Sequence, residues 1–199
     1  MDSFKEKGGA SDADSDQVSS PFDYPMQMEI LIHTAAPGPS GDDGRLDTGF
    51  LTREIQRLVG EVEGGSLVLF TSYRDLNAVA RVLTPLCSRD GRPVMYQGGG
   101  LSRSDLLEQF KACGNGVLLG TDSFWTGIDV PGPALSQVII TRLPFENPSH
   151  PIPEARAEKC RAEGRSPFAE LTLPAALVKF RQGIGRLIRN HTDEGRLVI

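Results

Sequence analysis

The run Ser66-Leu67-Val68-Leu69-Phe70, followed by residues 75–87, determines the fold class that the sequence predicts. The run is apolar without alternation, which is typical of a strand buried on both faces. Residues 75–87 are predicted to be a helix, because apolar side chains recur there at helical spacing: Leu76, Val79, Val82 and Leu83. A buried strand followed by such a helix is the repeating unit of a parallel sheet.

The same alternation continues through the rest of the chain. Further strands are expected at 28–33, 93–96, 116–120, 136–140 and 196–199. Further helices are expected at 50–62, 102–112, 154–161 and 174–189. Ser102 or Ser104 is expected to cap the second of these helices. Because the strands lack alternation and are separated by helices, the predicted fold is a three-layer α/β domain with a mostly parallel sheet.

The domain organisation follows from composition. Residues 1–20 are polar and contain glycine, so they are expected to be a disordered tail or a loop remnant of something larger. Residues 21–199 are expected to form one domain, which begins with an extended, proline-restricted segment at 21–25. The chain stops at Ile199 inside an apolar run, which predicts a fragment truncated at its C-terminal strand.

Bulk composition excludes several classes of protein. The chain has 199 residues, 39% hydrophobic and 24% charged content and a net charge of −5, as in an ordinary globular protein. It has no run of about 18 apolar residues and no secretory signal pattern, so no membrane association and a cytoplasmic location are expected. Three scattered cysteines and three scattered histidines predict a reducing compartment and no metal site.

Residues 180–189 (FRQGIGRLIR) are predicted to be the end of a helix with two different faces. Gln182, Arg186 and Arg189 share one face at i, i+4 and i+7. The opposite face is expected to meet the core through Leu177, Phe180, Ile184, Leu187 and Ile188.

Two readings of this segment remain open. It could be a surface helix with a basic, solvated face. Gly183 and Gly185, however, each cost about 1 kcal/mol within a helix, which suggests that something approaches the backbone closely. Two guanidiniums and a carboxamide suit a polyphosphate, so the segment is predicted to sense phosphate.

Polar residues also follow two predicted strands, at the edge where parallel sheets bind ligands. Thr71-Ser72-Tyr73 follows the strand at 66–70, and its hydroxyls could either bind phosphate or simply cap the next helix. Residues 120–132 (GTDSFWTGIDVPG) follow the strand at 116–120. Within them Trp125 is expected to lie in the core, whereas Asp129 is harder to explain as packing.

These motifs together carry a resemblance to a known family. Residues 182–189 (QGIGRLIR) resemble the QxxGRxxR signature that ends the second motor domain of superfamily 2 helicases. Residues 120–129 (GTDSFWTGID) and 142–145 (RLPF) precede it in the right order, and residues 20–25 (SPFDYP) resemble the segment that links the two motor domains. The combination most resembles the DinG-type branch of the XPD-related DNA helicases, whose motor domains are RecA-like.

The resemblance implies a role for each matching position. Gln182, Arg186 and Arg189 would face a nucleotide held by a partner motor domain, with the arginines acting as fingers on the γ-phosphate. Gly127 and Asp129 would line the same cleft. The single-stranded DNA track would be contacted by Thr71, Ser72, Tyr73 and Thr121. The family usually has glutamate where this chain has Thr126, so a coupling role of that acid is not expected here.

Other parts of the helicase machinery are missing from the sequence. It has neither a GxxxxGK[ST] loop nor an acidic box after a strand, so ATP and Mg²⁺ would be held mainly by the first motor domain. The family's four-cysteine iron–sulfur site also lies in that domain. The resemblance therefore implies half of an ATP-dependent DNA helicase with a role in DNA repair, inactive by itself and completed by its first motor domain.

Two alternatives remain open from the sequence. The chain could be a stand-alone nucleic-acid-binding module that has the helicase fold but no longer works as a motor. It could also be half of an RNA helicase, since no residue reads the 2′-hydroxyl and only the resemblance favours DNA.

Overall fold

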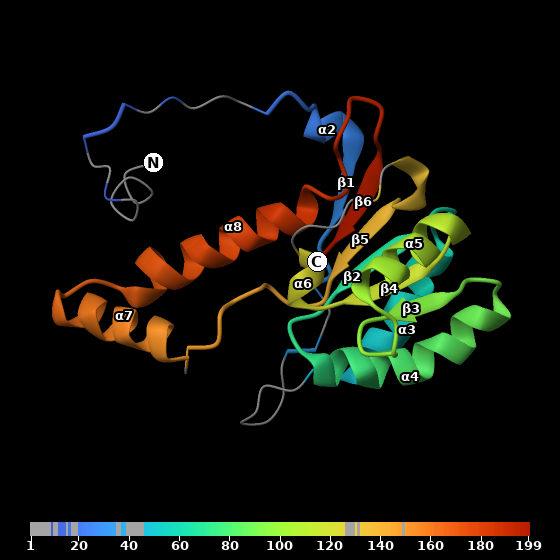
Figure 1. The fold of residues 1–199 in the computed structure, drawn as a ribbon, viewed down its shortest axis with the longest axis horizontal. Coiled ribbons are helices and arrows are strands. Elements are labelled where there is room, and N and C mark those ends of the chain that lie inside the picture. The colour runs from blue at the N-terminus through green and yellow to red at the C-terminus, as the bar shows by residue number, and fades with distance from the viewer. Residues whose placement is uncertain are drawn as a thin grey trace.

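The computed structural model describes residues 9, 12–14, 16, 20–34, 37–38, 46–125, 130, 132–148 and 150–199. Six strands form one sheet in the order β1-β6-β5-β2-β4-β3, and every neighbouring pair is parallel (Figure 1). The strands are β1 (Met28–Leu31), β2 (Ser66–Leu69), β3 (Val94–Tyr96), β4 (Val117–Gly120), β5 (Gln137–Ile140) and β6 (Gly195–Val198). Five of them lie within the ranges that the sequence predicts, and β6 begins one residue before its predicted range of 196–199.

Helices cover both faces of the sheet. Successive residues of β2 point to opposite sides, so that Leu67 and Leu69 join one apolar cluster and Val68 joins the other. Helices α5 (Arg103–Cys113) and α6 (Asp122–Trp125) contribute to the first cluster. Helices α3 (Thr48–Gly60) and α4 (Tyr73–Arg89) contribute to the second. The prediction of a three-layer α/β domain is confirmed.

Local sequence explains where these helices begin. The side chains of Asp47, Ser72 and Ser102 each accept a hydrogen bond from a backbone N–H in the first turn, at the starts of α3, α4 and α5. Of the two serines considered for α5, Ser102 is therefore the cap. The helix ends at Gly114, whose φ of 70° lies in the left-handed region that glycine adopts readily.

The predicted helix at 174–189 is too long. Helix α8 spans Leu173–Ile184 and is preceded by a π-helical turn, η2 (Phe168–Thr172). After Ile184 the backbone turns away, because the Asp193 carboxylate accepts hydrogen bonds from the N–H groups of Arg189 (2.8 Å) and Asn190 (3.1 Å). This turn buries Leu187 and Ile188 in the first apolar cluster.

Three smaller expectations also differ from the structure. Leu177 is 46% exposed and Val82 is 50% exposed, so neither belongs to the core. The segment at 21–25 is not wholly extended, because α2 (Tyr24–Gln27) begins within it with a proline near its first position, where no N–H is needed. Most of residues 1–20, including 1–8 and 17–19, lie outside the described residues, so the expected disorder stays a prediction.

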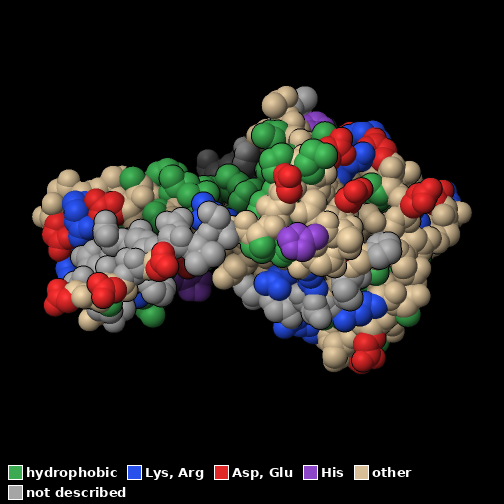
Figure 2. Space-filling view, turned by 90° about the horizontal axis from the view of Figure 1, so that it is seen from above, with side chains coloured by type: hydrophobic (Ala, Val, Ile, Leu, Met, Phe, Trp, Pro, Cys, Tyr) green, Lys and Arg blue, Asp and Glu red, His purple; other side chains and the backbone are tan. Residues whose placement is uncertain are grey.

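Helix α7 (Pro151–Ala162), η2 and the first half of α8 project from the sheet as an arm (Figure 1). Figure 2 shows this arm as a lobe beside the larger body, with charged side chains at its tip. Within the described residues, none of the helices is both long enough and apolar enough to cross a bilayer.

Candidate functional site

The carboxyl ends of the central strands meet at one edge of the sheet. Leu69 of β2 is aligned with Gly120 of β4 and with Ile140 of β5. Thr121 and Thr141 therefore lie at the same edge as residues 71–73. Thr141 is bonded to this edge, since its N–H (3.1 Å) and its hydroxyl (3.0 Å) both donate to the Leu69 carbonyl.

The three residues that follow β2 have different environments. The Ser72 hydroxyl accepts a hydrogen bond from the Asp75 N–H at 3.4 Å, so the capping role considered for this pair belongs to Ser72. Thr71 is half-buried, and the Tyr73 side chain is 51% exposed. The edge thus presents an accessible aromatic ring at the start of α4.

Gln97, directly after β3, organises the neighbouring part of this edge. Its Oε1 accepts hydrogen bonds from the Thr121 N–H (3.0 Å) and from the Thr121 hydroxyl (2.8 Å), and its Nε2 donates to Ser123 Oγ (2.9 Å). Thr121 is only 4% exposed, so its hydroxyl proton faces Gln97. Gln97 was not among the predicted site residues, although its position as a polar residue directly after a strand could have identified it.

Gln97→Leu is expected to destabilise the chain by about 1–3 kcal/mol, because it leaves two buried donors of Thr121 without an acceptor. The measurement is the free energy of unfolding from urea denaturation. Gln109→Leu is the matched control, since Gln109 is an exposed residue of α5, and it should change stability by less than about 0.5 kcal/mol. Equal effects of the two substitutions would contradict the role of Gln97.

Trp125 connects this edge to the end of α8. It is fully buried, as predicted, and its Nε1 donates to the Phe70 carbonyl at 3.2 Å. A Cβ atom on Gly183 would lie 2.9 Å from Trp125 Cε3 and 3.3 Å from Leu69 Cδ1. The group that approaches the Gly183 backbone closely is therefore the indole ring of Trp125, and the glycine is needed for packing.

Gly183→Ala is expected to destabilise the chain by about 1–3 kcal/mol, because the new methyl group overlaps a buried indole. Gly60→Ala is the matched control: Gly60 ends α3, and a Cβ there would meet no atom within 4 Å. That change should stabilise the chain by about 0.5–1 kcal/mol through helix propensity. Urea denaturation measures both. A stabilising effect at both positions would show that the Trp125 contact does not constrain Gly183.

The three polar residues of the signature remain adjacent although the helix ends at Ile184. Arg186 Nε donates to the Gln182 carbonyl at 3.1 Å, and Arg189 Nε donates to the Arg186 carbonyl at 3.2 Å. Gln182 is exposed and both arginines are half-buried. Hydrogen bonds from side chain to backbone thus link Arg186 to Gln182 and Arg189 to Arg186. Asp193 accepts a hydrogen bond from the Arg189 N–H and so fixes the backbone there. Asp193 was also not among the site residues predicted from the sequence.

Two predicted site residues, Gly127 and Asp129, lie outside the described residues, as does Thr126. Their assignment to the nucleotide cleft stays a prediction.

The described residues do not form a metal centre. In this part of the chain no three His, Cys, Asp or Glu side chains are grouped so that they could hold a metal ion. The three cysteines lie on different helices: Cys87 on α4, Cys113 on α5 and Cys160 on α7. Burial raises the pKa of the Cys87 thiol, as expected of a packing residue.

The chain is similar to curated bacterial proteins over most of its own length. It is 38% identical over 190 residues to the 3′-5′ exonuclease DinG of Bacillus subtilis (92% of this chain, 20% of that protein). It is also 38% identical over 199 residues to the ATP-dependent DNA helicase YoaA of Escherichia coli (98% of this chain, 30% of that protein). The chain therefore spans less than a third of the length of these relatives.

Solved structures support the fold. An XPD helicase matches with a TM-score of 0.64 at 22% identity, covering 86% of this chain and 31% of that chain. The C-terminal domain of the DEAD-box protein Dbp5 matches with a TM-score of 0.50 at 20% identity, covering 86% of this chain and 75% of that chain. At such identities these likenesses show the fold alone, which is RecA-like.

One family match covers enough of the chain to establish its family. The model of the helicase C-terminal domain matches residues 55–199, which include β2 to β6, the edge residues and the whole signature. With the DinG and YoaA relatives and the XPD-like fold, this confirms the resemblance to the DinG-type branch. The chain belongs to the helicase C-terminal domain family.

Proposed function

We infer that this chain is the second motor domain of an ATP-dependent DNA helicase and that it supplies one wall of the ATP cleft. The observation that supports this proposal is that Gln182, Arg186 and Arg189 are linked to one another by hydrogen bonds. They lie within the family match and are joined through backbone carbonyls. Helix α8, which carries Gln182 and ends shortly before the two arginines, packs through Gly183 against Trp125, next to the end of β2.

The chemistry of these side chains suits a polyphosphate. A guanidinium is permanently charged and planar, so it can bind two oxygens of a phosphoryl group at once. Because Arg186 Nε and Arg189 Nε each donate to a carbonyl, the orientation of both guanidiniums is constrained before any ligand binds. Preorganised charge of this kind stabilises the negative charge that develops on a transferring γ-phosphoryl group. Gln182 adds a neutral donor and acceptor.

The carboxyl edge of the sheet would carry part of the single-stranded DNA track. Thr71, Ser72, Tyr73 and Thr121 would contact the sugar-phosphate backbone, and the exposed Tyr73 ring could stack on a base. In the structure the Thr121 hydroxyl donates to Gln97, so binding phosphate through that proton requires the hydroxyl to turn. Gly127 and Asp129 would couple the track to the nucleotide.

In this proposal, the first motor domain provides the remaining parts of the helicase machinery. That domain would hold ATP and Mg²⁺ and complete the cleft. The described cysteines do not fit a four-cysteine iron–sulfur cluster, because they number three and lie on three separate helices. The chain by itself is therefore expected neither to hydrolyse ATP nor to unwind DNA.

The proposal is tested by complementation. The purified chain is mixed with the first motor domain of the same protein, and ATP hydrolysis is measured with and without single-stranded DNA. Restored, DNA-stimulated hydrolysis supports the proposal. Tight binding of single-stranded DNA by the chain alone with a steep salt dependence, and no restored hydrolysis, would instead indicate a nucleic-acid-binding module. Stimulation by RNA but not by DNA would indicate half of an RNA helicase.

A further inference from the structure

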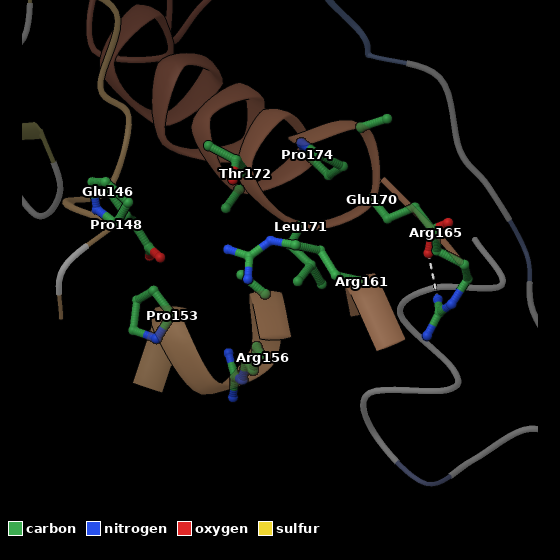
Figure 3. Close-up of a pocket in the computed structure, with 13 residues that line it drawn as sticks. Glu146, Pro148, Pro153, Arg156, Arg161, Arg165, Glu170, Leu171, Thr172 and Pro174 are labelled. Carbon is green, nitrogen blue, oxygen red and sulfur yellow. Dashed lines mark hydrogen bonds and ion pairs between the residues drawn. The ribbon is translucent and has the colours of Figure 1, made fainter. Parts of the chain in front are cut away.

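The arm carries a groove that the helicase proposal does not use. It lies between α7 and the η2–α8 segment and has a volume of about 770 Å³, within the range of about 300–1,000 Å³ that ligand sites have. Figure 3 shows lining residues from α7, from η2 and α8, and from the segment that holds Glu146 and Pro148. None of its lining residues belongs to the signature or to the edge residues at 71–73 and 121.

The groove combines an apolar surface with basic side chains. Seven of its lining residues are apolar: Pro148, Pro153, Ala157, Ala169, Leu171, Pro174 and Ala175. Three arginines also line it, namely Arg156, Arg161 and Arg165. In Figure 3 the Arg161 side chain extends from α7 into the space between the walls.

The three arginines differ in how far their charge is compensated. Arg165 forms ion pairs with Glu163 and Glu170, which together raise its pKa. Arg156 and Arg161 are exposed, and neither forms an ion pair or a hydrogen bond through its side chain with the part of the chain that the structure describes. Two uncompensated positive charges therefore stand beside an apolar surface on one helix.

We propose that this groove binds an acidic, aliphatic segment of a partner protein, with Arg156 and Arg161 each pairing with a carboxylate. Five helical positions separate the two arginines, which corresponds to about 7.5 Å along α7. Side chains two residues apart on an extended peptide are about 6.7 Å apart. Carboxylates at alternate positions of an extended peptide match this spacing, and small aliphatic side chains fit against Leu171 and Pro174.

The lining of the groove favours a peptide over a nucleic acid. Its described lining residues include no aromatic side chain on which a base could stack and no lysine. Glu146 and Glu170 line the same groove and would repel a ligand that carries a charge at every step. A peptide can instead place its few carboxylates near the two uncompensated arginines.

The location of the groove allows a partner to bind without covering the carboxyl edge of the sheet. The arm stands apart from the body that carries the edge residues (Figure 1, Figure 2). The groove is therefore an interaction surface that a helicase could use while it engages nucleotide and DNA. Binding to the groove is measured without ATP hydrolysis, so this proposal and the proposed function can be refuted independently.

The experiment measures fluorescence anisotropy of a labelled synthetic peptide with the 199-residue chain. The peptide alternates aspartate with leucine over about five residues, the length of extended chain that a helix of the size of α7 can accommodate. The same peptide with asparagine in place of aspartate is the ligand control, and a labelled oligothymidylate is the nucleic-acid control.

Arg156→Glu combined with Arg161→Glu is expected to weaken binding of the acidic peptide by tenfold or more. The matched control is Arg81→Glu, because Arg81 is an exposed arginine within α4 and does not line the groove. Arg81→Glu should leave binding unchanged. Circular dichroism checks that each variant is folded. If the double glutamate variant is unfolded, Arg156→Gln combined with Arg161→Gln is used in its place.

Three results would overturn the proposal. The acidic peptide could fail to bind, or bind no better than its asparagine control. The double substitution could weaken binding no more than Arg81→Glu does. Finally, the oligothymidylate could bind more tightly than the peptide and depend on the same two arginines, which would make the groove a nucleic-acid surface.

Discussion

Arg189→Ala is expected to lower DNA-stimulated ATP hydrolysis by about a thousandfold or more, because an arginine finger contributes roughly 10³–10⁵ to the rate of phosphoryl transfer. The rate is measured with the chain and its first motor domain combined. The substitution removes the guanidinium whose Nε donates to the Arg186 carbonyl, whereas the Arg189 N–H can still donate to Asp193. The loss should therefore appear in catalysis rather than in the fold.

Two further variants make this result specific. Arg181→Ala is the matched control, since Arg181 is an exposed arginine of α8 one residue before Gln182, and it should leave the rate within about twofold. Arg189→Lys keeps the charge but loses the planar fork, so it should recover only part of the rate. An unchanged rate for Arg189→Ala would rule out its role as a finger.

Trp125→Ala is expected to destabilise the chain by about 3–5 kcal/mol, the usual cost of removing a large buried aromatic side chain. The indole is fully buried, and it contacts the position where Gly183 allows α8 to approach the sheet. Its hydrogen bond to the Phe70 carbonyl is lost as well. Because Trp125 is the single tryptophan of the chain, unfolding should be followed by circular dichroism rather than by fluorescence.

The control for this substitution is Tyr73→Ala. Tyr73 is a 51% exposed aromatic residue at the same edge of the sheet, and its truncation should change stability by less than about 0.5 kcal/mol. Trp125→Phe keeps a ring in the core and should cost less than Trp125→Ala. Similar stabilities of Trp125→Ala and Tyr73→Ala would mean that the indole does not hold α8 against the sheet.

The layers of the fold could be predicted from local patterns. The apolar runs at 66–70 and 116–120 are typical of strands buried on both faces, and the helices between them carry their apolar residues at helical spacing. Hydroxyl side chains before the first turns predicted a cap at Ser102 or Ser104, and capping was one of two interpretations of Thr71 and Ser72; the structure identifies Ser102 and Ser72. The π-helical turn at Phe168–Thr172 could not be predicted, because it has no sequence pattern of its own.

The candidate site could be predicted only in part. The order of motifs pointed to Gln182, Arg186 and Arg189, because a resemblance depends on residue types and spacing. Gln97 and Asp193 were missed, since each acts through contacts with residues distant in the sequence or with backbone groups of a turn. Periodicity alone extended the helix to Arg189, whereas burial of Leu187 and Ile188 required the chain to turn after Ile184.

The sequence by itself determined the class of this protein: a parallel α/β sheet and a helicase-type signature, without a GxxxxGK[ST] loop in these 199 residues. Those properties follow from local periodicity and from residue identity. Only the tertiary structure showed that Gly183 leaves room for the Trp125 ring and that the Thr121 hydroxyl donates to Gln97. It also showed that a groove lined partly by arginines lies on the arm. The reason is physical. The Gly183–Trp125 and Thr121–Gln97 contacts join segments that are separated in the chain and meet only when the elements pack together. The groove depends on how α7 lies against η2 and α8, which no local sequence pattern specifies.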